Sequence, residues 1–142
     1  MNIIYKSFCV NHTKLILSVL LAVLLFGCQK SPINGRLDGQ WEVMQVDPKA
    51  SAIINQRIFY NFSLHVCQLT YYGSGGLFLS GNIKYDGDTL WIEFPKADSE
   101  KTVKTLRQYG ILTNPVSFDV EFKDNHTLLL TSNESTVMLV KH

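Results

Sequence analysis

Cysteine is scarce in this sequence, and two of its three cysteines lie near the N-terminus. Cys9 falls inside an apolar leader and Cys28 directly follows it, so Cys67 is the single thiol of the remaining chain. An exported domain with one thiol forms no intramolecular disulfide. The sequence therefore excludes a disulfide-stapled scaffold, and stability must come from packing.

The chain also lacks a strong excess of either charge. The 115 residues from Cys28 to His142 carry 11 basic and 12 acidic side chains, a net charge of −1. No stripe of basic residues is present, which removes the usual electrostatic argument for nucleic-acid binding. We find no internal repeat and no low-complexity tract, and a segment of this length suits one domain around a single core.

The first 27 residues have a different character from the rest, because 18 of them are apolar and none is acidic. Residues 15–26 form an apolar run of 12, which is the length of a signal-peptide core and too short to span a bilayer. The run ends in Leu25-Phe26-Gly27-Cys28, which resembles a bacterial lipobox. This resemblance implies cleavage before Cys28 and acylation of its thiol. The alternative is an ordinary secretory signal that is cleaved elsewhere.

Three segments follow from this interpretation: a lipoprotein signal peptide (1–27), a lipidated cysteine with a polar tether (28–36), and a folded domain (37–142). Acyl chains on Cys28 would anchor the domain to a membrane, the one partner that the sequence indicates directly. Gln29, rather than Asp, follows the cysteine. By resemblance to lipoprotein sorting rules this implies the outer membrane, with the periplasmic or cell-surface face left open.

Strand patterns recur at short spacing along the domain. Seven segments are predicted as strands: 40–46, 57–71, 77–85, 89–94, 116–123, 127–131 and 136–141. In the second segment apolar residues occupy the even positions from Ile58 to Val66, and its length lets it bend and serve two regions of a sheet. Asp86-Gly87 predicts a hairpin turn, since Gly tolerates positive φ and Asp does so better than most residues.

One helix is predicted at about residues 98–109. Asp98 or Ser99 can cap its first turn, and Gly110 can end it. Its apolar stripe is narrow, so we expect it to lie against the outside or one end of the sheet. Seven to eight short strands joined by tight turns predict an all-β, antiparallel barrel or sandwich, and a barrel leaves no exposed edge.

The start of the first strand carries a family resemblance. Gly39-Gln40-Trp41, preceded by Leu37-Asp38, resembles the G-x-W opening of lipocalins, and the late strand series is similar to small lipocalin-like bacterial lipoproteins. The resemblance implies an up-and-down barrel in which Gly39 and Trp41 pack across the closed end. It also makes Lys141, on the last strand, a candidate to cover Trp41.

A barrel of about eight strands is either filled by its own side chains or holds one small ligand, and the sequence leaves both outcomes open. A ligand would contact the even face of segment 57–71 and the aromatic residues beyond it. The candidate lining residues are Tyr60, Phe62, Leu64, Tyr72, Phe78 and Trp91. The Gly-rich residues after Tyr72 are not followed by a helix, so they do not fit a phosphate-binding loop.

Candidate chemistry is sparse. His65 and Cys67 lie two apart on a predicted strand and would share one face, but nothing places a third or fourth metal ligand beside them. No nucleophile, base and oxyanion element come together in the sequence. We therefore expect no metal site, no cofactor and no enzymatic activity.

These observations predict a membrane-anchored envelope lipoprotein whose lipocalin-like barrel binds a small apolar or amphipathic ligand. The alternative is a filled barrel that acts through its outer surface, as a protein-interaction module or as an inhibitor of an envelope enzyme, with an unidentified protein partner. A dry apolar void in the barrel would favour the first hypothesis, and large side chains that meet in its centre would favour the second.

Overall fold

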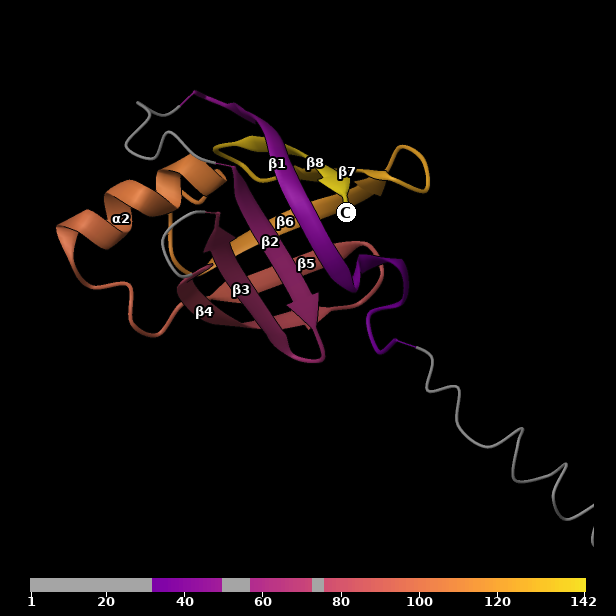
Figure 1. Cartoon of the computed structure of the whole chain (residues 1–142), viewed down its shortest axis with the longest axis horizontal. Helices are drawn as coiled ribbons and strands as arrows, with labels where there is room; N and C mark the ends of the chain where they lie inside the picture. The colour runs from indigo at the N-terminus through magenta and orange to yellow at the C-terminus, as the bar shows by residue number, and fades with distance from the viewer. Residues whose placement is uncertain (1–31, 50–56, 73–75) are drawn as a thin grey trace, which may run out of the picture. The chain divides into compact units, whose positions relative to one another are not determined.

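The computed structural model describes residues 32–49, 57–72 and 76–142, so the predicted signal peptide and Cys28 lie outside the described residues. Eight antiparallel strands form a closed barrel in which β8 pairs with β1 (Figure 1). The strands are β1 (Gly39–Asp47), β2 (Ile58–Ser63), β3 (Val66–Tyr71), β4 (Gly76–Tyr85), β5 (Thr89–Glu93), β6 (Val116–Phe122), β7 (Thr127–Thr131) and β8 (Thr136–Lys141). The predicted antiparallel up-and-down barrel is confirmed.

The prediction of one long strand over residues 57–71 was wrong, because this segment forms the β2–β3 hairpin. Ser63 pairs with Val66, so Leu64 and His65 make a two-residue turn. Such a turn reverses which positions face inward: even positions point into the barrel in β2, and odd positions such as Cys67 do so in β3. The apolar alternation runs unbroken through the turn, and for that reason the sequence pattern concealed it.

The first short helix, η1 (Gly35–Leu37), covers one end of the barrel, which we call the closed end. The Asn34 side chain is buried there, donating hydrogen bonds to Asp38 Oδ1 (2.6 Å) and to the Leu64 carbonyl (2.7 Å). These bonds tie the chain before η1 to the β2–β3 turn. The described fold therefore includes Asn34, Gly35 and Arg36, which were expected to belong to the tether.

The predicted helix is confirmed as α2 (Glu100–Leu106), which continues into the short helix η2 (Arg107–Tyr109). Ser99 is its N-cap, with Oγ accepting a hydrogen bond from the Thr102 amide at 3.1 Å. Gly110 ends it with φ +76°. This segment lies at the other end of the barrel, which we call the helix end (Figure 1). Within the described ranges, no helix combines the length and apolar character needed to cross a membrane.

Candidate functional site

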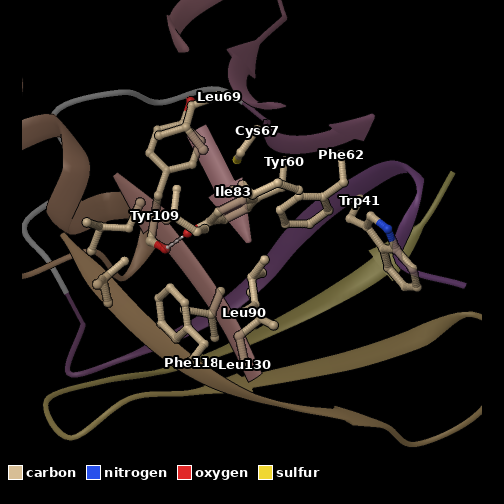
Figure 2. Close-up of a cluster of buried hydrophobic side chains, with 14 of the residues drawn as sticks. Trp41, Tyr60, Phe62, Cys67, Leu69, Ile83, Leu90, Tyr109, Phe118 and Leu130 are labelled. Carbon is tan, nitrogen blue, oxygen red and sulfur yellow. Dashed lines mark hydrogen bonds between the residues drawn. The ribbon is translucent and has the colours of Figure 1, made fainter. Parts of the chain in front are cut away.

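The interior of the barrel is occupied by large side chains that no solvent reaches (Figure 2). The rings of Tyr60 and Phe62 stack with centroids 5.6 Å apart, and Tyr109 meets Tyr60 edge-on at 5.7 Å. Apolar residues from β1 and β3–β8 complete this core, including Trp41, Cys67, Leu69, Ile83, Leu90, Ile92, Phe118, Leu128, Leu130, Val137 and Leu139. Large side chains thus meet in the centre of the barrel.

The polar atoms within this core are satisfied. Tyr60 Oη donates a hydrogen bond to the Tyr109 carbonyl at 2.5 Å, and Tyr109 Oη donates one to the Thr70 carbonyl at 2.9 Å. Burial raises the pKa of the Cys67 thiol well above its usual value, so this thiol stays protonated at neutral pH. The described interior therefore offers a packed, hydrogen-bonded core rather than a reactive group.

Trp41 lies fully buried at the closed end, where η1 and β8 hold it. Its indole Nε1 donates a hydrogen bond to the Leu37 carbonyl at 2.8 Å. Lys141 Nζ lies 5.0 Å from the centroid of the Trp41 ring and donates a hydrogen bond to the Arg36 carbonyl at 3.1 Å. Gly39 makes room for this lysine, since a Cβ there would lie 3.2 Å from Lys141 Cε. Lys141 thus covers Trp41 in the manner that the family resemblance implied.

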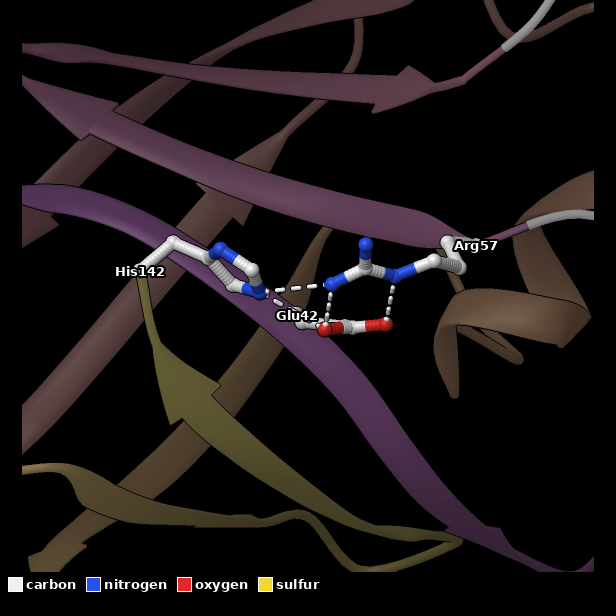
Figure 3. Close-up of polar contacts among 3 residues, drawn as sticks. All are labelled: Glu42, Arg57 and His142. Atoms are coloured by element: carbon white, nitrogen blue, oxygen red, sulfur yellow. Dashed lines mark hydrogen bonds and ion pairs between the residues drawn. The ribbon is translucent and has the colours of Figure 1, made fainter.

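A polar cluster lies on the outer surface of the barrel, where β1, β2 and the end of β8 come together (Figure 3). The Arg57 guanidinium donates two hydrogen bonds to the Glu42 carboxylate, from Nε and from Nη2, each 2.5 Å long. His142 Nε2 lies 2.7 Å from Glu42 Oε2 and 2.8 Å from Arg57 Nη2. One ring nitrogen cannot both accept from Arg57 and donate to Glu42, so the tautomer of the His142 ring decides which of these two bonds Nε2 makes.

Aromatic rings lie directly beside this polar cluster. Phe59 is buried although it points away from the barrel interior, because Tyr72 contacts it edge-on at 4.9 Å and His142 at 5.4 Å. The Arg57 guanidinium lies 5.4 Å from the Phe59 centroid and 5.8 Å from that of Tyr72. We call Glu42, Arg57, Phe59, Tyr72 and His142 the outer cluster.

An open groove of about 400 Å³ runs beside the outer cluster, over β1, β2 and β3. Its lining combines amide, hydroxyl and aromatic side chains: Gln40, Phe59, Asn61, Gln68, Thr70, Tyr71 and Tyr72, with Gly76 at one edge. Asn61 is held in place by a hydrogen bond to Thr70 Oγ1 at 2.9 Å. We call this feature the outer groove. It presents neutral hydrogen-bonding groups next to exposed ring and guanidinium surface.

A second groove of about 390 Å³ lies between β4 and the chain that follows β5. The pairing of β4 with β5 begins only at Asn82, so the residues of β4 before it have no partner in β5. The Phe94 ring packs over Gly81, where a Cβ would lie 2.8 Å from the ring. The groove is lined by Val66, Phe78, Leu79, Ser80, Gly81, Asn82, Pro95 and Lys96. It carries no cluster of charged or hydrogen-bonded side chains comparable to the outer cluster.

The outer cluster makes stability depend on pH through Glu42. The Arg57 hydrogen bonds hold the pKa of Glu42 at about 2, below its usual 4.5, against the opposing effect of partial burial. Because the pKa of Glu42 is lower in the folded chain than in the unfolded chain, the ionised carboxylate stabilises the fold fully above about pH 5. This stabilisation is lost as the pH falls toward 2. Because Arg57 is more than half exposed and solvent screens the pair, we expect Glu42→Gln to lower the free energy of unfolding by about 1 kcal/mol at pH 7.

Urea unfolding from pH 7 to pH 2 measures this effect, and the difference between wild type and Glu42→Gln should shrink below pH 5. Glu121→Gln is the matched control, because it removes a carboxylate whose ion pair with Lys123 joins two exposed side chains. Its cost at pH 7 should be the smaller of the two. A Glu42→Gln difference that stays constant across this range would contradict the assignment.

The candidate lining residues do not all face the barrel interior. Tyr60 and Phe62 are inside, and Phe78 stacks on Tyr109 with centroids 6.1 Å apart. The other three candidates were misplaced. Leu64 is 58 % exposed because it lies in the β2–β3 turn, and Trp91 points outward, where Lys84 Nζ lies 5.0 Å from its ring centroid.

Tyr72 is also outside the barrel, packed on Phe59 and 57 % exposed.

The expectation that His65 and Cys67 share a strand face was wrong, because only Cys67 belongs to a strand. His65 belongs to the exposed turn, whereas the Cys67 side chain is enclosed in the core. Among the described residues, no three His, Cys, Asp or Glu side chains are grouped as metal ligands would be.

No local sequence pattern predicted the outer cluster. Glu42 and His142 are 100 positions apart, and only the closure of the barrel through β1 and β8 brings them together. The register Glu42↔Phe59 between β1 and β2 then places Arg57 within reach. The sequence indicates only that Glu42 points outward, because it follows the inward Trp41. This does not show which side chains Glu42 would contact.

Comparison with known proteins agrees with the architecture. A family model described as a lipocalin-like domain matches residues 22–142. A lipocalin-like protein from Bacteroides uniformis superposes with a TM-score of 0.58 at 24% identity, covering 76% of this chain and 100% of that one. An uncharacterized protein from Bacteroides eggerthii gives a TM-score of 0.53 at 16% identity, covering 74% and 98% respectively. No curated protein matches the sequence. At these identities the two structures show likeness of fold alone.

Proposed function

The chain belongs to the lipocalin-like domain family, and from this premise we propose that it is a lipid-anchored domain of the bacterial envelope that recognises a protein partner through the outer surface of its barrel. The proposal departs from the ligand-binding hypothesis raised by the sequence. One observation carries it: Trp41, Tyr60, Phe62, Tyr109 and Phe118 fill the described interior. Ligand pockets are usually cavities of about 300–1,000 Å³, and these rings occupy the space that a ligand would need.

The outer cluster supports recognition of a protein. Tyr and Arg are the residue types that most often dominate binding energy at protein interfaces. Tyr72 and Arg57 are each more than half exposed, yet both are held in place, Tyr72 by Phe59 and Arg57 by Glu42. A side chain that is ordered before binding loses less conformational entropy on binding. The outer groove beside them has the size to receive side chains of a partner.

The remaining parts of the proposal rest on the sequence. The lipobox-like Leu25–Cys28 supports acylation of Cys28, and Gln29 supports the outer membrane as the destination. A packed core with a buried, protonated Cys67, and the lack of any group of three His, Cys, Asp or Glu side chains among the described residues, support a binding role rather than catalysis.

Photo-crosslinking in the native host tests the partner. A photoreactive residue replaces Gln68 in the outer groove of the full-length chain, and the control places it at Asp119, an exposed position on β6. We expect a discrete protein adduct at position 68 and none at position 119. Tyr72→Ala should reduce that adduct about tenfold or more, as the loss of an interface anchor does.

Native mass spectrometry tests the opposing hypothesis on the same material. The mass of the folded protein, released from the envelope of its own host, is measured first under native conditions. It is measured again after solvent extraction. We expect the bare mass of the acylated chain. A small apolar molecule that stays bound until the protein unfolds, together with no adduct at position 68, would overturn the proposal and establish a ligand-binding barrel.

A further inference from the structure

Exposed apolar side chains gather where the folded domain begins. Ile33 is 60 % exposed, Leu64 58 % and Val66 37 %. The hydrogen bond from Asn34 Nδ2 to the Leu64 carbonyl (2.7 Å) places the chain at Ile33 beside the β2–β3 turn. We call Ile33, Leu64 and Val66 the closed-end apolar patch. None of these side chains contributes to the barrel core.

Leu64 has an unusual backbone conformation for its residue type. Its φ is +55°, and it is the single non-glycine residue with positive φ among the described ranges. Turn positions of this kind favour Gly, Asn or Asp, because a leucine gains no local hydrogen bond there and its Cβ is crowded. A leucine that is both strained and exposed does not serve the stability of the fold, so its presence points to a role outside the barrel.

The length of the chain before the domain limits what this patch can reach. Three residues separate Cys28 from Pro32, the first described residue. Even fully extended, they allow about 14 Å between Cys28 and Pro32. If Cys28 carries the lipid anchor, as proposed above, the closed end is the part of the domain nearest the bilayer surface.

We propose that the closed-end apolar patch inserts into the interfacial region of the membrane to which the chain is anchored. Three apolar side chains are too few to draw a free protein out of solution onto a bilayer. The anchor changes this, because tethering raises their effective concentration at the surface, and a weak interaction then decides the orientation of the domain. Insertion would fix the closed end on the lipid and leave the helix end facing away from it.

Charge at the closed end indicates that insertion depends on apolar contact rather than on anionic lipid. The basic side chains Arg36 and Lys141 pack against Phe122 and Trp41. The β4–β5 and β6–β7 turns at the same end carry the acidic residues Asp86, Asp88 and Asp124. Because both signs of charge are present, we expect binding to phosphatidylcholine vesicles that changes little with salt.

The test uses the full acylated chain in phosphatidylcholine vesicles, with an environment-sensitive fluorophore attached to Ile33→Cys or Leu64→Cys. Cys67 is buried and will not react under native conditions. Met44→Cys is the matched control, because Met44 is 56 % exposed but lies on the barrel wall in β1. At positions 33 and 64 we expect blue-shifted emission and about threefold less quenching by aqueous iodide than at position 44.

Leu64→Asn separates membrane contact from folding. Asn tolerates positive φ, so this variant should unfold at a higher urea concentration than the wild type. With the fluorophore at position 33, the same variant should lose its protection from iodide. Equal quenching at positions 33, 64 and 44 in vesicle-bound protein would overturn the inference. So would protection that appears only after envelope proteins are added, since the patch would then be a protein interface.

Vesicle flotation and the intact mass report on the anchor separately. If the chain lacks the acyl mass and does not float, the anchoring part of the proposed function fails, and the inference fails with it. If the chain floats with its acyl mass but positions 33 and 64 stay quenched, the anchor stands and membrane insertion of the patch is refuted.

Discussion

Trp41→Ala should lower the free energy of unfolding by about 3–5 kcal/mol, the usual cost of removing a large aromatic side chain from a packed core. Trp41 is fully buried, its indole N–H bonds to the Leu37 carbonyl, and Lys141 covers its ring. The substitution removes all three interactions and leaves a void beneath η1. For a domain of this size the expected fall in Tm is roughly 10–20 °C.

Trp91→Ala is the matched control, because it removes the same side chain from the outer wall. Its indole lies under Lys84 and outside the core, so the expected cost is about 1 kcal/mol or less. Urea unfolding followed by circular dichroism measures both variants. If Trp41→Ala prevents folding, Trp41→Phe should still fold with an intermediate loss. Equal losses for Trp41→Ala and Trp91→Ala would contradict the role of Trp41 as the packing residue of the closed end.

Gly110→Ala is expected to cost about 3 kcal/mol or more, from two separate causes. The residue adopts φ +76°, which for a side-chain-bearing residue costs about 1–2 kcal/mol. A Cβ would also lie 2.2 Å from Cγ2 of Val137, a fully buried residue in β8. Such overpacking costs about 1–3 kcal/mol. The turn after η2 fits against β8 because this position has no side chain.

Two further variants separate these causes. Gly35→Ala has φ +57° and no atom within 4 Å of the added Cβ, so it should incur the backbone cost alone. In the double variant Gly110→Ala with Val137→Ala, the overlap is relieved, and the loss should be smaller than the sum of the single losses by about 1 kcal/mol. Additive losses measured by urea unfolding would show that Val137 does not set the cost at Gly110.

The sequence predicted the barrel well because its signals are local. Each strand other than the β2–β3 pair shows its own apolar pattern, and Ser99 and Gly110 mark the ends of the helical segment in the way that capping chemistry requires. The Gly39-x-Trp41 pattern identified the closed end for a similar reason, since a few adjacent residues carry it. Features that depend on three to ten adjacent residues, such as strand patterns and helix caps, can be predicted from the sequence alone.

The β2–β3 hairpin escaped prediction because its turn breaks those rules. A turn with positive φ is normally announced by Gly, Asn or Asp, and here Leu64 occupies it. The missed turn reversed the inward positions downstream, so Cys67 was wrongly expected to share a strand face with His65. One unusual residue thus changed the expected chemistry of a whole strand.

The outer cluster could not be predicted for a different reason. Its members come from both ends of the domain, and their contact depends on the closing register of the barrel rather than on any local pattern. Whether a barrel of this size is hollow or filled is also a property of the assembled side chains. Tyr109 reaches Tyr60 from a segment 49 positions away, and neither residue alone indicates that the two meet.

The pairing of β8 with β1 has a consequence for how the domain is made. The first strand to be synthesised, β1, can pair with β8 only after β8 has also been synthesised. Closure of the barrel therefore forms contacts between residues that lie far apart in the sequence. Contacts of this kind form late, and until then β1 and β7 present unpaired edges that invite aggregation.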